Sequence, residues 1–361
     1  MESHALLWLQ LREQLQLPSG VLRQLMALAP DPRLLVNRLT DDTQAPLRAV
    51  IRRVPAVLRQ ADARNLLQQR LDAAACEIIC LADADYPGLL AEIHDPPPLL
   101  FLRGRRELLS VPMLAIVGSR RSSHRGLDDA RQFAAALASL GFGVVSGMAR
   151  GIDASAHRGA LDVAGTTLAV LGCGVDVCYP RSSQKLYQEI AEQGLILSEY
   201  NLGTPPLRHQ FPQRNRIISG LSLGVLVVEA AVQSGSLITA RQALEQNRDV
   251  FALPGSIHSP SSRGCNALIK QGAKLVETTA DIVEELSGWS AGSPVLAEET
   301  PPDVLAPDSA LLPLLDFAPQ ALDVLAARSA LPIPVLLAEL GELELGGWVE
   351  QQPAGWLRRR E

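Results

Sequence analysis

Apolar residues recur at intervals of three and four along residues 1 to about 75, and this spacing predicts a small helical domain. One such helical face carries Leu22, Leu25, Met26 and Ala29. The pattern breaks at Leu17-Pro18-Ser19-Gly20 and resumes at Val21, which predicts two helices joined by a turn. We expect this domain to have a structural role.

Short apolar runs alternate with helical patterns beyond residue 110. The runs lack strict polar alternation, which is typical of strands buried on both faces, and they are Met113 to Val117, Gly143 to Ser146, Thr167 to Leu171, Leu195 to Ser198, Gly224 to Val228 and Asp249 to Ala252. Helical patterns lie between or after them, at Gly126 to Leu140, Ile152 to Val163, Ser182 to Gln193, Arg214 to Leu221, Ser236 to Gln246 and Gly264 to Gln271. This order predicts an α/β fold with a doubly wound, mostly parallel sheet.

The chain changes character after residue 288. Residues 289–309 are rich in proline and acidic residues and predict a linker. Helical patterns at Ala321 to Ala326 and Val335 to Leu345 precede a predicted hairpin at Gly346 to Glu350, an order typical of a winged-helix domain. This domain could contact either DNA or another protein. Three glutamates on its second helix would face phosphate unfavourably, which argues for protein contact: Glu339, Glu342 and Glu344.

The length of 361 residues and the hydrophobic content of 47% exceed what one domain usually holds. We predict a helical domain at residues 1–80, an extended Rossmann-like core at 81–288, the linker at 289–309 and a winged-helix-like domain at 310–361.

The 33 basic and 39 acidic residues give a formal net charge of −6. General nucleic-acid binders are usually basic, so any site for a polyanion must be a local patch. Residues 103–125 hold six arginines and one acid, and residues 200–228 hold three arginines and no acid. A run of charge is usually a solvated face, so its meaning depends on motifs that bring these arginines together.

The five cysteines form no C-x-x-C pair and have no histidines at zinc-ligand spacing, so we expect reduced thiols and neither a metal nor a cofactor. No run approaches 18 uninterrupted apolar residues, and the N-terminus lacks the features of a signal peptide. We therefore expect a cytoplasmic protein without a membrane partner.

Ligands of open parallel sheets bind beyond the carboxyl ends of the strands, where helix N-termini carry partial positive charge. Gly118-Ser119-Arg120 follows the first buried strand, so its small residues let backbone amides approach an anion while the arginine donates a bidentate fork. Ser146 and Gly147 open the next loop, which leads to Asp153 in the first turn of a helix. A structural cap and a functional role stay equally open for Asp153.

The stretch from Phe211 to Ser222 is the third candidate loop. It places Arg214, Asn215 and Arg216 at the start of a helix, where positive charge opposes the helix dipole. Such a local conflict is typical of a functional site. Phe211 beside these arginines predicts a base-stacking surface with phosphate clamps, which we favour over a solvated helix start.

Gly235 and Ser236 lie in a fourth loop, at the place where phosphoribohydrolases of a related fold carry paired glycines and a catalytic glutamate. Both features are missing here. We expect Glu229 to be a buried hydrogen-bond acceptor for the neighbouring loop, and His157 to be a packed helix residue, because it has no triad-like partner. A nucleotide-processing enzyme stays the alternative function.

Together, these four segments resemble the motifs of the DNA-processing protein A family, also called Smf, over roughly Asp85 to Leu286. The resemblance implies an extended Rossmann core that binds single-stranded DNA without enzymatic activity. It also implies that the protein protects incoming DNA during natural transformation (competence), loads the RecA recombinase onto it, and forms a homodimer.

The resemblance also implies roles for individual residues. Arg120 matches the family's phosphate-contacting arginine, and Arg214 to Arg216 match its second basic region. The expected DNA-binding residues are Gly118, Ser119, Arg120, Ser146, Gly147, Phe211, Arg214, Asn215, Arg216, Gly235 and Ser236. The expected dimer contacts are Asn266, Leu268 and Ile269.

Overall fold

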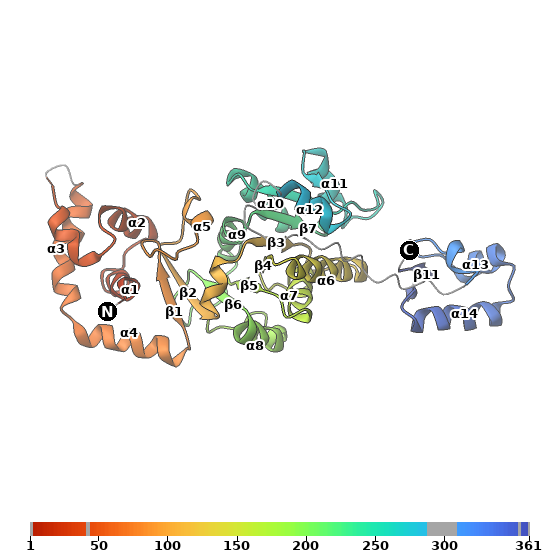
Figure 1. Ribbon diagram of the computed structural model, residues 1–361, viewed down its shortest axis with the longest axis horizontal. Helices are drawn as coiled ribbons and strands as arrows, with labels where there is room; N and C mark the ends of the chain where they lie inside the picture. Colours follow the sequence, from red (N-terminus) through yellow and green to blue (C-terminus); the bar gives the residue numbers. More distant parts are fainter. Residues whose placement is uncertain (1–2, 41–43, 287–308, 353–354, 360–361) are drawn as a thin grey trace. The chain divides into compact units, whose positions relative to one another are not determined.

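The computed structural model describes residues 3–40, 44–286, 309–352 and 355–359 (Figure 1). The chain divides into two compact units, Met1–Ser293 and Pro294–Glu361, and each is described by itself. The predicted linker at 289–309 lies outside the described residues, apart from Ser309.

The chain begins with helices that pack around α1. They are α1 (His4–Leu15), α2 (Ser19–Leu28), the 3-10 turn η1 (Pro32–Arg38), α3 (Ala45–Leu58) and α4 (Ala61–Ala73). Trp8 on α1 is fully buried, and its Nε1 donates to the Pro30 carbonyl at 2.9 Å. Gln10, also on α1, donates to the Val57 carbonyl at 2.9 Å, which fixes α1 to the end of α3.

Within the described residues, one sheet of nine strands forms the core. The strands are β1 (Glu77–Cys80), β2 (Leu99–Gly104), β3 (Met113–Val117), β4 (Gly143–Ser146), β5 (Thr167–Val170), β6 (Leu195–Ser198), β7 (Gly224–Val227), β8 (Asp249–Ala252) and β9 (Lys274–Leu275). Their order is β1-β2-β6-β5-β4-β3-β7-β8-β9. The strands from β6 to β9 in this order pair in parallel, and β2 pairs antiparallel with β1 and with β6. The predicted mostly parallel sheet is confirmed.

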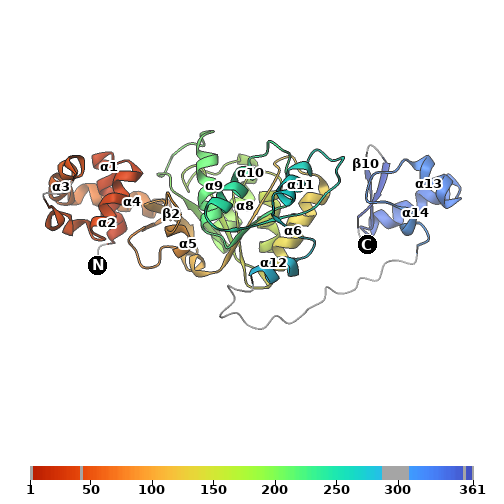
Figure 2. The ribbon, with the colours of Figure 1, turned by 90° about the horizontal axis from the view of Figure 1, so that it is seen from above.

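Helices cover both faces of the sheet, because alternate side chains of each buried strand point to opposite sides. Leu114 and Ile116 of β3 pack with the side that carries α6 (His124–Ser139), α7 (Ile152–Asp162) and α12 (Thr279–Glu285). Ala115 and Val117 pack with the other side, which carries α9 (Gln210–Gly220), α10 (Ser236–Glu245) and α11 (Arg263–Lys270). Figure 1 shows α9 and α10 on one side of the strands and α7 and α8 (Gln184–Gln193) on the other. In Figure 2, which is seen from above, helices of the two layers such as α8 and α9 overlap.

The structure corrects three sequence expectations. Glu77–Cys80 forms an edge strand paired with β2, so the predicted domain boundary after residue 80 falls inside the sheet. This four-residue strand follows a run of alanines, so periodicity could not separate it from the preceding helix. The helix α12 follows β9, where the α11 segment was expected to be the last helix of the core. The helix α9 begins at Gln210 rather than Arg214, because Pro212 is tolerated in a first turn whose amides have no intrahelical acceptor.

The second unit contains η5 (Leu312–Leu314), α13 (Leu322–Ser329), α14 (Ile333–Leu345) and an antiparallel hairpin of β10 (Val349–Gln352) and β11 (Gly355–Arg358). Its core gathers residues from both helices and the hairpin, among them Leu325, Leu336, Leu340 and Trp356. Two helices followed by a hairpin confirm the predicted winged-helix arrangement.

Among the described residues, none of the helices is by itself both long and apolar enough to span a membrane. The pair α13 and α14 passes that test jointly by length and composition, and it is bent by 105°.

We expect Leu137→Ala to lower the free energy of unfolding by about 2–5 kcal/mol, because this α6 side chain is fully buried and its truncation leaves a cavity. The matched control is Leu244→Ala on α10, which is 57% exposed and should change stability by less than about 0.5 kcal/mol. Urea unfolding measures both, and equal effects would contradict the assigned core.

Candidate functional site

Three loops at the carboxyl edge of the parallel strands are bonded to one another. The Ser119 amide, after β3, donates to the Glu229 carbonyl, after β7, at 2.7 Å. The Ile152 amide at the start of α7 donates to the Ser119 carbonyl at 3.3 Å. The structure therefore brings Gly118-Ser119-Arg120, the Ser146–Gly151 loop and Glu229 together. Gly151 has φ 81°, which explains the glycine at this tight turn.

A row of one cation and two aromatic rings lies at this edge. The Arg120 guanidinium carbon is 5.7 Å from the centroid of the Phe211 ring, and the Tyr179 ring centroid is 5.5 Å from that of Phe211. Arg120 is exposed, Phe211 is half-buried and Tyr179 is 45% exposed. We call Arg120, Phe211 and Tyr179 the stacking row. It presents flat apolar surface and positive charge to solvent.

Tyr179 is the member of the row that the sequence analysis missed. It lies in the loop between β5 and α8, and Gly172 in that loop lies so close to Phe211 that a Cβ there would stand 3.1 Å from the ring. The signal was available, since the β5 strand ends, like β3 and β4, before a glycine-containing loop. An exposed tyrosine in such a loop is a candidate contact of the same ligand.

Arg214 does not reach the surface, in contrast to its expected role as a phosphate clamp. It is 3% exposed, its Nη1 donates to the Val170 carbonyl at the end of β5, and a Cβ at Gly147 would overlap its guanidinium. Burial lowers the pKa of Arg214 to about 10, which the nearby Asp153 carboxylate partly offsets. Arg214 therefore fastens α9 to β5 and to the Gly147 loop.

Asp153 is buried beside Arg214. Burial raises the pKa of this carboxyl above its usual value, and the Arg214 charge counteracts that rise. Its Oδ2 accepts from the Ala149 amide at 3.4 Å, in the loop before α7. Asp153 therefore accepts a hydrogen bond from an amide of the preceding loop, and not from a free amide of its own helix.

Arg216 lies on the other side of α9 and is held by two carboxylates. Its two terminal nitrogens each bond to Glu199 at 2.7 Å, and its Nε lies 3.2 Å from Oδ2 of Asp95. Only 14% of its side chain is exposed. Asn215 is half-buried between the two arginines. Of the four predicted residues on α9, Phe211 is the one whose ring lies beneath the Arg120 guanidinium.

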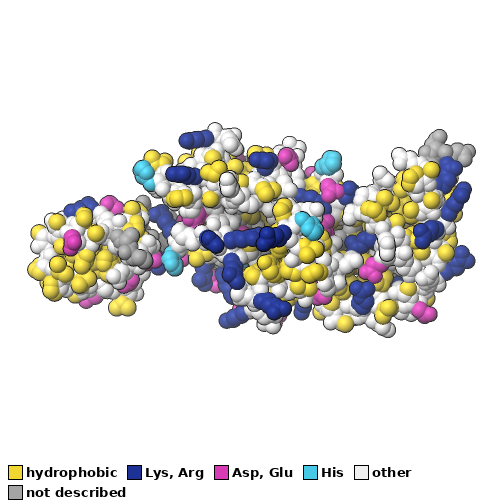
Figure 3. Space-filling view, turned by 180° about the vertical axis from the view of Figure 1, so that it is seen from behind, with side chains coloured by type: hydrophobic (Ala, Val, Ile, Leu, Met, Phe, Trp, Pro, Cys, Tyr) yellow, Lys and Arg dark blue, Asp and Glu magenta, His cyan; other side chains and the backbone are white. Residues whose placement is uncertain are grey.

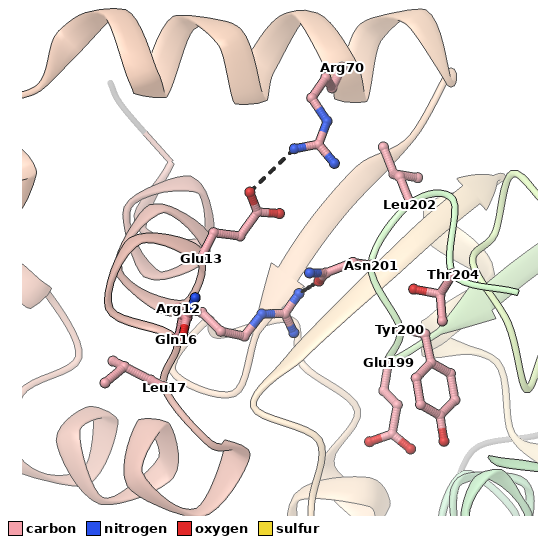
Figure 4. A pocket seen from close by; sticks show the side chains of 10 residues that line it. All are labelled: Arg12, Glu13, Gln16, Leu17, Arg70, Glu199, Tyr200, Asn201, Leu202 and Thr204. Atoms are coloured by element: carbon pink, nitrogen blue, oxygen red, sulfur yellow. Dashed lines mark hydrogen bonds and ion pairs between the residues drawn. The ribbon is translucent and has the colours of Figure 1, made fainter. Parts of the chain in front are cut away.

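Glu199 also borders a cavity of about 640 Å³ between α1, α4 and the loop after β6 (Figure 4). Arg12 extends from α1 across this space, donates to Asn201 and places its guanidinium carbon 5.3 Å from the centre of the Phe101 ring. Burial lowers the pKa of Arg12 to about 10, and Glu13 and Glu199 oppose that change. The helical part of the chain is thereby joined to the strand end that holds Arg216.

Several predicted residues support the edge from within. Ser146 is buried and donates to the Ile116 carbonyl at 2.6 Å, and buried Ser236 bonds to the Ser234 hydroxyl at 2.6 Å, with exposed Gly235 between the two serines. The Glu229 carboxylate accepts from the Ser123 amide at 2.9 Å, which confirms the predicted buried acceptor.

His157 is fully buried, as the sequence predicted for a packed helix residue. Its Nδ1 lies 2.7 Å from the Thr167 hydroxyl oxygen, and its Nε2 has no hydrogen-bond partner among the described residues. Burial lowers the pKa of His157 to about 3. The ring is therefore neutral at physiological pH, and its distance from solvent fits a structural role.

The predicted dimer residues face inward more than outward. Leu268 is buried and Ile269 packs against the core. The Asn266 amide bonds to both the amide and the carbonyl of Gly255. Exposed apolar side chains lie in neighbouring segments instead, at Val232 (62% exposed), Ile238 (42%) and Ile257 (75%).

Further exposed arginines lie in the loops that carry the stacking row or next to them, and none of them forms an ion pair among the described residues: Arg121, Arg150, Arg181 and Arg208. Figure 3 shows basic side chains in a row across one face of the molecule.

The five cysteines are unpaired, as predicted. The described residues contain no group of three or more histidines, cysteines and acids that could hold a metal ion.

A family model described as DNA recombination-mediator protein A matches residues 77–287. The chain belongs to this family. A second family model, described as the DprA winged helix domain, matches residues 296–355 of the chain.

Two related proteins illustrate the similarity. Protein Smf of Escherichia coli strain K12 is 46% identical over 286 residues, which cover 77% of this chain and 76% of that protein. The DNA processing protein DprA of Streptococcus pneumoniae strain R6 is 47% identical over 205 residues, which cover 57% of this chain and 72% of that protein.

Solved structures show the same core. DNA processing protein A of Streptococcus pneumoniae superposes with a TM-score of 0.64 and 37% identity, covering 79% of this chain and 99% of that one. DNA processing protein A of Helicobacter pylori, whose single-stranded DNA binding mode has been described, gives a TM-score of 0.54 and 32% identity over 59% of this chain and 96% of that one.

We expect Arg214→Met to lower the free energy of unfolding by about 3–5 kcal/mol, because it leaves the buried Asp153 carboxylate without a compensating charge. The double variant with Asp153→Asn should recover part of this loss, since neither charge is then buried alone. Urea unfolding of the two single variants and the double variant measures the coupling. Simple additivity would contradict the pairing of these two side chains.

His157 should make stability depend on pH. The unfolded chain binds a proton at this ring below about pH 6.5, whereas the folded chain does so only near pH 3, so lowering the pH from 6.5 favours unfolding. The contribution is fully present above pH 6.5. Relative to His157→Gln, the wild-type protein should lose roughly 2 kcal/mol between pH 6.5 and 5. Parallel stability profiles of the two proteins would exclude a buried neutral histidine.

Proposed function

We propose that the protein binds single-stranded DNA on the stacking row and acts as a recombination mediator. In this role it protects incoming strands during natural transformation and loads the RecA recombinase onto them. The observation that carries the proposal is the exposed Arg120 guanidinium above Phe211, with Tyr179 alongside. Membership of the recombination-mediator family supports the same role.

The chemistry of the stacking row suits a single strand. Each base has a flat face that an aromatic ring can cover, and such stacking contributes about 1–3 kcal/mol per base whatever the sequence. The bases of a duplex are already stacked and paired, so their faces are not available to Phe211 or Tyr179. The unpaired arginines around the row would contact the phosphates and make binding sensitive to salt.

The predicted residues divide into contacting and positioning groups in this proposal. Arg120 and Phe211 contact the strand. Gly118 and Gly147 let the loops pack closely, because a Cβ at either position would overlap a neighbouring side chain, and the Ser119 amide is bonded to the Glu229 carbonyl. The other predicted residues hold these loops in place, because their side chains are buried, half-buried or bonded within the protein: Ser146, Arg214, Asn215, Arg216 and Ser236. Exposed Gly235 leaves the start of α10 open to a ligand.

We also propose that the protein works as a homodimer. The exposed apolar side chains Val232, Ile238 and Ile257 support an interface in that part of the core. Two copies would place two stacking rows on one strand and raise the apparent affinity through effective concentration.

The proposal assigns no catalytic step to this site. Glu229, the carboxylate at the end of β7, is buried and accepts a hydrogen bond from the Ser123 amide. Release of a base or a ribose phosphate from nucleoside monophosphates by the purified protein would instead favour the nucleotide-processing alternative.

We expect Arg120→Ala to weaken the binding of an oligothymidylate at least tenfold and to reduce the salt slope of log K by about 0.7, the value for one phosphate contact on a single strand. Phe211→Ala should cost about 1–3 kcal/mol of binding. Fluorescence anisotropy across a salt series measures both.

Arg105→Ala is the matched control for Arg120→Ala, because this exposed arginine at the end of β2 is paired with Glu107. It should leave binding unchanged. Assembly of RecA on the strand should rise with the wild-type protein and the control, and fall with Arg120→Ala. Unchanged binding in both Arg120→Ala and Phe211→Ala would refute the proposed site.

A further inference from the structure

The outer face of α3 carries arginines and no acid. Arg52, Arg53 and Arg59 are exposed and Arg48 is half-buried, while Ile51, Val54 and Val57 on the inner face are buried. The neighbouring η1 adds exposed Arg38. We call Arg38, Arg48, Arg52, Arg53 and Arg59 the arginine face. Among the described residues, Arg38, Arg52 and Arg53 form no ion pair.

The helical domain is net positive, although the whole chain is net negative. Residues 1–75 contain ten arginines and seven acids, a net of +3, whereas the whole chain carries −6. The remainder therefore carries −9. Two of the seven acids, Asp41 and Asp42, adjoin the arginine face in sequence and lie outside the described residues.

Two residues of the arginine face lie one helical turn apart. Arg48 and Arg52 are four residues apart on one helix, a spacing at which like charges destabilise the helix. Arg48 bonds to the Thr40 carbonyl at 3.3 Å and Arg59 to the Pro55 carbonyl at 3.0 Å, and these contacts position the guanidinium groups. A polyanion would relieve the repulsion, and the planar guanidinium fork matches phosphate oxygens.

We infer that the arginine face binds the phosphate backbone of the same DNA strand whose bases occupy the stacking row. This inference rests on the proposed function. It assigns the helical domain a part in DNA binding, in place of the purely structural role expected from its sequence. Figure 3 shows basic side chains gathered on the helical domain as well as across the core.

The fold sets the length of strand that can use both surfaces. The helix α1 packs against β1 and β2 on one side and against α3 on the other, so α3 is the outer layer. The strand β3, which leads to Arg120, lies four places from β2 in the sheet. Four strand spacings of about 4.8 Å along the sheet and two layers of about 10 Å at right angles to it place the two surfaces roughly 28 Å apart, the length of about 8 nucleotides at B-form rise.

Strand length therefore separates the two surfaces experimentally. An oligothymidylate of about 6 nucleotides is too short to extend from the stacking row to the arginine face, whereas one of about 30 nucleotides can contact both surfaces. We expect the full-length double variant Arg52→Ala/Arg53→Ala to bind the short strand as the wild type does. It should bind the long strand on the order of tenfold more weakly at 0.1 M salt, with a salt slope smaller by about 1.4.

Two further variants make the test specific. Arg105→Ala/Lys185→Ala removes the same charge from exposed positions elsewhere and should leave both strands bound as before. Arg52→Lys/Arg53→Lys keeps the charge and should retain most of the salt slope. Because Arg52 and Arg53 are exposed, all variants should unfold at the wild-type temperature.

The outcomes distinguish this inference from the proposed function. If Arg120→Ala abolishes binding of both strands and Arg52→Ala/Arg53→Ala leaves the long strand unaffected, the inference is wrong and the proposed function stands. An equal loss on both strands would also overturn it, because the effect would then not depend on reach. If the wild-type protein binds neither strand, the proposed function itself fails.

Discussion

The buried guanidinium of Arg214 is the interaction on which the candidate site depends. It joins α9 to the end of β5 through the Val170 carbonyl, lies against Gly147 and faces the buried Asp153. Its burial has a desolvation cost, and a nearby carboxylate with a backbone acceptor offsets it. Because Phe211 lies three residues earlier on the same helix, fixing Arg214 also fixes Phe211 beside Arg120.

A second constraint holds the opposite side of α9. Glu199 accepts two hydrogen bonds of 2.7 Å from Arg216, and the same carboxylate lies near Arg12 of the helical domain. The helix that carries the stacking ring is thus clamped between the sheet and the N-terminal helices. Such preorganisation lowers the entropy lost when a ligand orders the site. In the proposed function, the helical domain then supports the site physically and also extends the path of the strand.

Much of this could be predicted from the sequence, and the failures have physical reasons. Buried parallel strands are continuous apolar runs, so β3 and β8 are predicted at their observed bounds, and glycines follow the strand ends at the edge where the Ser119, Ile152 and Glu229 loops meet. Arg214 was misplaced because an arginine in a loop motif suggests exposure, and its burial depends on partners distant in sequence, Asp153 and Val170. Tyr179 was missed although its loop also follows a strand end and contains glycine, because only the folded loop brings its ring to Phe211.

The central claim is that a single DNA strand lies across the stacking row. Ultraviolet cross-linking of a bromodeoxyuridine-substituted single strand to the full-length protein, followed by mass spectrometry of the cross-linked peptides, tests it most directly. The account predicts cross-links at Phe211 and Tyr179, with fewer when Arg120 is replaced by alanine. Cross-links confined to the winged-helix unit, with none at Phe211 or Tyr179, would contradict it.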